Sequence, residues 1–225
     1  MSNPIQGLLN VIINEQLPKV NSEIQEAIKN NHLDPWGQVA HGTANLGSVN
    51  LGVCNAEARA NYHVKNMTGL SSLNIDQLEI KSVQQGANSS EYLGTVHMSA
   101  LLRGNLTGHL GGRVEASCGF MHPSVAIGGL ANVNGLTADA TGSFTASMDG
   151  NKVCLNSITL SAVSINYANV HVETDGLGIF NEFTAKLIDM ITELFKGQIS
   201  GAISSAITPI ISKELESVLP QCQNL

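Results

Sequence analysis

The spacing of hydrophobic residues changes twice along the chain. Near both ends, apolar residues recur every three or four positions, which places them on one face of a helix. Between the ends, apolar and polar residues alternate, as they do in a half-buried strand. The sequence therefore predicts a helix over residues 1–31, an antiparallel sheet over residues 38–173 and a long helix over residues 176–219, within one domain of 225 residues.

The C-terminal segment is the longest predicted element. Its apolar stripe runs from Ile179 to Val218, and about 40 residues at 1.5 Å each would form a rod of about 60 Å. Such a stripe needs an equally long cover, because it cannot stay exposed to water. Gly197, Gly201 and Pro209 are weak helix residues and predict a bend or break in the rod.

The N-terminal segment predicts a second amphipathic helix. Pro4 suits the first helical position, and apolar residues follow at helical spacing as far as Ile28. Pro18 interrupts the middle of this pattern, which predicts a kink or two abutting helices. Trp36 lies in the turn that follows this segment, where we expect it to pack over the end of the helix.

The middle of the chain predicts about six long strands joined by short turns, and therefore an antiparallel meander. Residues 56–64 show the cleanest alternation, and one extra residue near Gln77 predicts a bulge. Asp149-Gly150-Asn151 predicts a hairpin turn. The last strand, residues 153–173, loses its apolar phase twice, so we expect it to be strongly bent or bulged.

These elements together predict an α+β fold, an elongated super-roll whose curved antiparallel sheet wraps around the long C-terminal helix. Many inward positions carry small side chains, so facing layers would leave an apolar cavity. The candidate ligand-lining residues are Leu9, Ile12, Ile13, Met98, Leu102, Val114, Phe120, Phe144, Met148, Phe183, Leu187, Met190, Ile191 and Leu194. The alternative for each of them is plain packing in a hydrophobic core.

Composition narrows the class of partner. Charged residues make up 13% of the chain and the net charge is -7, which argues against binding nucleic acid or an anionic membrane through bulk charge. Aromatic residues make up 4%, so the interior is mostly aliphatic. Few aromatics and many small residues favour a flexible chain as the ligand over a flat ring.

No catalytic constellation is visible in the sequence. A nucleophile elbow, a Walker loop and an H-E-x-x-H motif are all missing. The seven histidines are scattered, and His63, His97 and His109 fall on the polar side of predicted strands, where we expect them to be solvated. A metal site between His97 and His109 is the one alternative. We expect no enzyme activity, no metal and no cofactor.

Four widely spaced cysteines permit two disulfides in three connectivities, or buried free thiols. N-glycosylation sequons at Asn66, Asn88 and Asn105 slightly favour a secreted glycoprotein. The chain carries neither a signal-peptide pattern nor a transmembrane span. We therefore expect either a cytosolic protein or a form whose signal has been removed.

Several local runs, taken in order, resemble the tubular lipid-binding (TULIP) superfamily across nearly the whole chain. Within it, the chain is most similar to the branch of the group-seven mite allergens and the juvenile-hormone-binding and Takeout-like proteins. The resemblance rests on the first helix ending in Leu33-Asp34-Pro35-Trp36, the strand from Ala56 to Val64, His122-Pro123, and residues 175–180 leading to residues 209–216. The close N-terminal cysteine pair of the hormone binders is missing, since the first cysteine is Cys54.

The resemblance implies an apolar tunnel or groove, secretion, and non-enzymatic carriage of an elongated ligand such as a fatty acid, terpenoid, sterol or carotenoid pigment. It also implies an allergen-like protein. The alternative function is a surface-active or innate-defence protein that acts at lipid or air–water interfaces. Transient membrane contact and homo-oligomerisation at an apolar tunnel mouth are further expectations.

Overall fold

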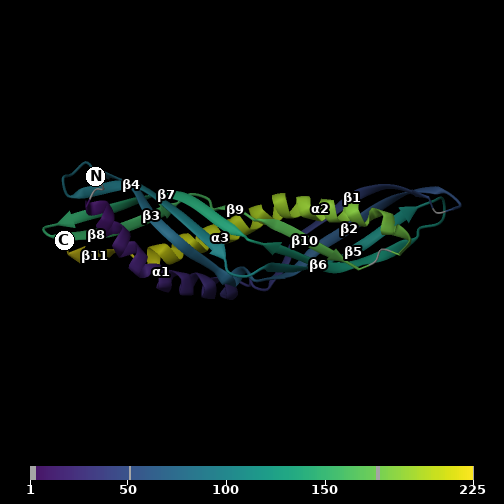
Figure 1. Ribbon diagram of the computed structural model, residues 1–225, viewed down its shortest axis with the longest axis horizontal. Coiled ribbons are helices and arrows are strands. Elements are labelled where there is room, and N and C mark those ends of the chain that lie inside the picture. Colours follow the sequence, from purple (N-terminus) through teal and green to yellow (C-terminus); the bar gives the residue numbers. More distant parts are fainter. Residues whose placement is uncertain (1–3, 51, 176–177, 225) are drawn as a thin grey trace.

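The computed structural model describes residues 4–50, 52–175 and 178–224. The molecule is elongated, and two curved antiparallel sheets lie end to end along it (Figure 1). The C-terminal helices run beside both sheets, whereas the N-terminal helix covers one of them. The expected fold class, an elongated α+β roll built along a long C-terminal helix, is confirmed.

The two sheets divide the strands between the two halves of the molecule. The five-stranded sheet has the order β1 (Trp36–Asn50), β2 (Asn55–Thr68), β5 (Leu106–Ser117), β6 (Ser124–Asn134) and β10 (Asn169–Thr174). The six-stranded sheet has the order β11 (Gln221–Asn224), β8 (Lys152–Leu160), β7 (Thr137–Asp149), β4 (Glu91–Leu102) and β3 (Leu73–Gln85), and β9 (Ser164–Asn166) pairs with β7. A short 3-10 helix, η1 (Leu70–Ser72), precedes β3.

Two expectations about the sheet are corrected. First, the single meander is two sheets. Strand β1 lies largely within the predicted sheet range of residues 38–173 but was not recognised as a separate strand, because its sequence is rich in Gly, Asn and Ser and buries few apolar side chains, notably Ala40 and Leu46. Second, residues 153–173 form parts of β8, β9 and β10 rather than one bent strand. The two losses of apolar phase mark the points where these strands end and begin.

Two smaller predictions about the strands are confirmed. The pairing of β3 with β4 shifts register between Ile75 and Gln77, where the bulge was expected, and again between Ile80 and Ser82. Gly150 adopts a positive φ of 58° in the turn that joins β7 to β8, as a tight hairpin requires.

The C-terminal rod consists of η2 (Gly178–Phe183), α2 (Thr184–Leu194), a π-helical turn η3 (Phe195–Ile199) and α3 (Ser200–Ser217). The irregularity expected at Gly197 is present as this π turn. Gly201 and Pro209, in contrast, lie inside α3 without ending it. The expected start of the rod at Gly176 lies outside the described residues.

Helix α1 (Pro4–Asn30) is one helix that contains Pro18, so the expectation of two abutting helices is wrong. It changes direction along its length in Figure 1. Its buried apolar face lies against the six-stranded sheet and α3. None of the described helices is long and apolar enough to cross a membrane.

One buried amide joins α1 to the outer edge of β3. Asn21 is 9% exposed, its Nδ2 donates to the carbonyl oxygen of Ile75 at 3.0 Å, and its Oδ1 accepts from the Ile75 N–H at 2.7 Å. The side chain thus pairs with β3 as a neighbouring strand would. An edge strand otherwise presents unpaired backbone groups, and here a helix satisfies them.

Three more amides continue this contact. Asn10 Oδ1 accepts from the N–H of Ile80 at 2.7 Å, and Gln6 Nε2 donates to the Ile80 carbonyl oxygen, also at 2.7 Å. Gln25 Nε2 lies 3.4 Å from the carbonyl oxygen of Leu73. We call Gln6, Asn10, Asn21 and Gln25 the amide row, because they lie along one side of the apolar stripe of α1.

Two disulfides resolve the open question of cysteine pairing. Cys54 pairs with Cys118 and links the end of the β1–β2 loop to the end of β5. Cys154 pairs with Cys222 and fixes β11 to β8 at the opposite end of the molecule. Each closes a long loop, with sequence separations of 64 and 68 residues, and therefore restricts the unfolded chain.

The amide row yields a prediction about stability. Asn21→Ala leaves a buried N–H and a buried carbonyl of Ile75 without partners, and should lower the free energy of unfolding by about 2–4 kcal/mol. Asn14→Ala is the matched control, because Asn14 is exposed and bonds only within α1, to the carbonyl oxygen of Asn10. Its effect should stay within about 0.5 kcal/mol. Urea unfolding followed by circular dichroism measures both, and equal effects would contradict a stabilising role for the amide row.

Candidate functional site

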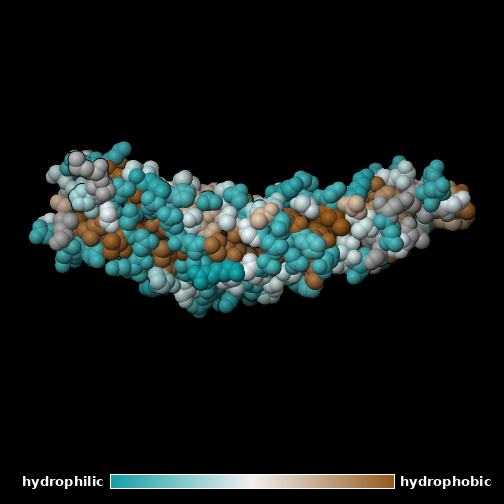
Figure 2. All heavy atoms as spheres, in the orientation of Figure 1, coloured by the Kyte–Doolittle hydropathy of each residue, from teal (hydrophilic) through white to brown (hydrophobic). Residues whose placement is uncertain are grey.

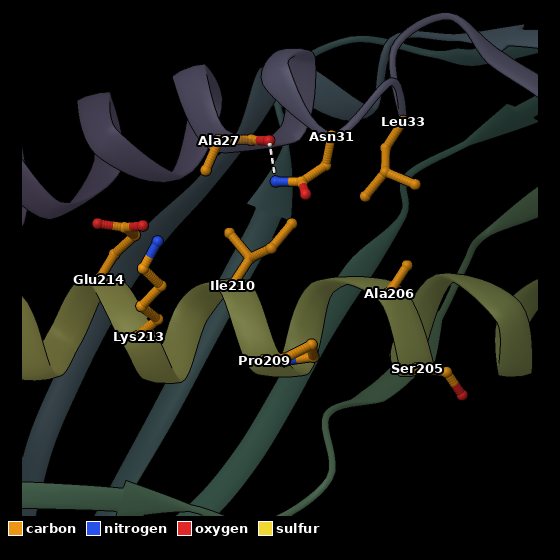
Figure 3. Close-up of a pocket in the computed structure, with 9 residues that line it drawn as sticks. All are labelled: Ala27, Asn31, Leu33, Ser205, Ala206, Pro209, Ile210, Lys213 and Glu214. Atoms are coloured by element: carbon orange, nitrogen blue, oxygen red, sulfur yellow. Dashed lines mark hydrogen bonds between the residues drawn. The ribbon is translucent and has the colours of Figure 1, made fainter.

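A groove lies between the C-terminal end of α1 and the middle of α3 (Figure 3). Its volume is about 420 Å³, within the range of about 300–1,000 Å³ that is typical of ligand sites. It is lined by Ala27, Asn31, Leu33, Ser205, Ala206, Pro209, Ile210, Lys213 and Glu214. We call it the α1–α3 groove.

The floor of the groove follows from helical spacing. Two rows of α3 residues, each with steps of four positions, lie side by side: Ser205, Pro209 and Lys213 in one row, and Ala206, Ile210 and Glu214 in the other. The small side chains of Ser205 and Ala206 leave space between the helices at one end. Ile210, only 9% exposed, belongs to the core and connects the floor with the apolar interior.

Both helices that form the groove are fixed on the sides that face away from it. The amide row ties α1 to β3. On the opposite side of the groove, Thr208 Oγ1 accepts from the N–H of Val163 at 3.2 Å, and Ser204 Oγ donates to the Val163 carbonyl oxygen. The groove is therefore the seam between two anchored elements.

The two ends of the groove differ in polarity. Lys213 and Glu214 rise from α3 at one end, whereas Leu33 and Ala206 lie at the other (Figure 3). Asn31 Nδ2 donates to the Ala27 carbonyl oxygen at 2.7 Å, so this amide is held against its own helix. Lys213 is exposed and forms no ion pair with any residue the structure describes. The Glu214 carboxylate lies beside its ammonium in Figure 3, so this end of the groove carries one charge of each sign.

Thirteen of the fourteen residues predicted to line a cavity, all except Phe120, fall into two groups along the molecule. One group lies in the six-stranded half, on α1, β4 and β7: Leu9, Ile12, Ile13, Met98, Leu102, Phe144 and Met148. The other lies in the five-stranded half, on β5 and the rod: Val114, Phe183, Leu187, Met190, Ile191 and Leu194. Met148 and Met190 are half-buried and the others in both groups are buried. They belong to or pack against one apolar core.

The interior placement of Phe120 is wrong. Strand β5 ends at Ser117, and Phe120 is 93% exposed in the turn that follows. Alternation alone cannot show where a strand stops, and Gly119 was the available signal of a turn. The groove residues were missed for another reason: the prediction followed the largest apolar side chains, whereas the space lies where α3 carries small ones.

The histidines do not assemble a reactive site. His97 lies on β4 and His109 on β5, in different sheets, so a metal site between them is contradicted. The described residues contain no group of three or more side chains suited to hold a metal. Of the three histidines expected to be solvated, His109 is exposed, whereas His63 and His97 are half-buried. Burial, with a smaller contribution from the Lys65 charge, lowers the pKa of the His63 imidazole.

No protein-family model and no curated protein matches the chain. Two solved structures are similar to it over most of its length. Lipopolysaccharide binding protein is 14% identical with a TM-score of 0.36, and the match covers 95% of this chain and 38% of that one. Epiphyas postvittana Takeout 1 is 12% identical with a TM-score of 0.32, and the match covers 94% and 92% of the two chains.

This chain thus spans well under half of the lipopolysaccharide binding protein chain. Both TM-scores lie below 0.5. The two matches are therefore likenesses only, and the function follows from the chain's own residues.

Proposed function

We propose that this protein is a non-catalytic carrier of an elongated apolar molecule, which enters at the α1–α3 groove. The observation that carries the proposal is a largely apolar groove between two helices, open to solvent, whose floor includes the core residue Ile210. Burial of ligand surface would drive binding at about 25 cal/mol per Å², less the cost of ordering the ligand. A narrow seam suits a flexible chain.

The charged end of the groove favours one of the four ligand classes. A fatty acid could lay its acyl chain along Leu33, Ala206 and Ile210 and place its carboxylate near the Lys213 ammonium. Terpenoids, sterols and carotenoids lack that carboxylate in their simplest forms and would use only the apolar part. We therefore infer a long-chain carboxylic acid as the preferred ligand, with the Glu214 carboxylate at the same end offsetting part of the attraction to Lys213.

The same proposal places the protein outside the cell. Two disulfides are typical of oxidising compartments. The sequon residues Asn66, Asn88 and Asn105 are all exposed, so a glycosylating enzyme could reach them. The surface-active alternative requires α1 to swing away from the sheet, and the hydrogen bonds of the amide row to the β3 backbone oppose that opening.

Filling the groove should abolish ligand uptake. Ala206→Trp places a large ring where the groove is lined by a small side chain, and should weaken binding of a fluorescent fatty-acid analogue at least tenfold. Ala185→Trp, an exposed position on α2, is the matched control and should bind as the wild type does. Fluorescence titration measures both, with thermal unfolding to confirm that each variant is folded. Equal uptake by the two variants would exclude the groove as the entry site.

The role of Lys213 can be tested separately. Lys213→Gln should weaken binding of a long-chain fatty acid about two- to fivefold, the range expected for an exposed ion pair. Binding of the fatty alcohol of the same chain length should not change, because the alcohol carries no charge. Competition against the fluorescent analogue gives both values. A parallel loss for acid and alcohol would show that Lys213 only packs against the chain.

A further inference from the structure

Exposed apolar side chains gather at the end of the molecule formed by the five-stranded sheet. Val53 is 76% exposed, Phe120 93% and Met121 37%. Val53 precedes Cys54 in the β1–β2 loop, and Phe120 and Met121 form the β5–β6 turn after Cys118. The Cys54–Cys118 disulfide holds both loops together. We call Val53, Phe120 and Met121 the apolar tip, and Figure 2 shows hydrophobic spheres at this end.

The position of Phe120 is built by the backbone. Cys118 and Met121 exchange N–H···O=C hydrogen bonds of 2.9 and 3.0 Å, and Gly119 between them has a φ of 59°. A two-residue hairpin turn with glycine at its first central position is a standard tight turn. Its second central residue projects into solvent and is usually small or polar. A phenylalanine there costs solubility and contributes nothing to the core.

The tip also lacks charge. Residues 50–56 and 117–124 contain no Asp, Glu, Lys or Arg. The nearest charged residue is Glu57 on β2, which pairs with Ser117 in the sheet. On β5, Arg113 Nη1 lies 3.9 Å from Glu115 Oε1, so these two charges have opposite signs and form an ion pair. Inserting this end into an apolar phase therefore desolvates no charged side chain of the two loops.

From these observations we propose that the apolar tip docks the protein on the surface of a neutral lipid membrane, with Phe120 and Val53 inserted among the acyl chains. A narrow convex end cannot supply the roughly 800 Å² per partner of a standard protein interface, but it can enter a lipid surface. The net charge of -7 disfavours anionic lipid. This inference rests on a different part of the molecule from the α1–α3 groove and is independent of it.

Sedimentation with phosphatidylcholine vesicles tests the proposal. The wild type should bind, and raising the salt concentration should not weaken binding, because the driving force is apolar burial rather than charge. Phe120→Ser should lower the partition coefficient about tenfold. Leu93→Ser is the matched control, since Leu93 is 45% exposed on β4 of the six-stranded sheet, and it should bind as the wild type does.

A reporter variant makes the test independent of any loss of folding. Phe120→Trp should give an emission that shifts to the blue on adding vesicles and is quenched by brominated acyl chains, whereas the wild type, which contains only Trp36, should show neither effect. Unchanged binding by Phe120→Ser would overturn the proposal. The proposal would also be overturned if the wild type did not bind vesicles but formed a dimer in sedimentation velocity, and Phe120→Ser dissociated that dimer.

The groove and the tip can be separated in the same experiment. Phe120→Ser should still take up the fluorescent fatty-acid analogue, and Ala206→Trp should still bind vesicles. Loss of vesicle binding in Ala206→Trp would show that lipid extraction through the groove, rather than the tip, holds the protein on the membrane.

Discussion

The fold depends on how the open edges of its two curved sheets are closed. A strongly curved sheet that does not close into a barrel leaves backbone groups unpaired at each edge, and water or another chain must satisfy them. Here helices lie along the edges. The amide row of α1 bonds the outer edge of β3, and Lys186 of α2 donates to the carbonyl oxygen of Leu46 in the edge strand β1 at 2.8 Å.

This arrangement explains why α1 is polar on one flank of its apolar stripe. Asn and Gln carry both a donor and an acceptor, so one side chain can bond an N–H and a C=O of the same strand residue, as Asn21 does with Ile75. A charged residue could offer only one of the two, at a higher cost of burial. The helix thereby joins the sheet through side-chain hydrogen bonds to the β3 backbone as well as through apolar packing. It also covers the β3 edge, which could otherwise pair with another chain.

Sequence periodicity predicts the long-range plan because burial is what creates the periodicity. The stripes of α1 and of the C-terminal rod, the alternation in β2 and the bulge near Gln77 all report which side chains face the core. Periodicity cannot show which strands pair. The prediction therefore joined β8 and β10 into one strand, although they belong to different sheets. The glycine- and asparagine-rich β1 was not recognised as a separate strand within the predicted sheet range, because an edge strand with few buried side chains leaves little alternation to detect.

The candidate sites were harder to predict for a related reason. A groove is defined by missing volume, so it is marked by small residues such as Ser205 and Ala206, which a search for apolar stripes passes over. Phe120 shows the opposite error: it continued an inward alternation in the sequence, although Gly119 ends the strand. Apolar character therefore identified candidate positions, but chain geometry decided whether each faces the core, a ligand or solvent.

The rod shows how one helix can serve two sheets. Its buried residues advance mainly in steps of four, through Leu187, Ile191, Phe195, Ile199, Ile203 and Ile207. Four residues exceed one α-helical turn by about 40°, so the stripe winds around the rod. The π turn at Phe195–Ile199 accommodates an extra residue where the rod passes between the two halves. The apolar face can thereby turn from one curved sheet to the other without a break, which keeps a single core continuous along an elongated molecule.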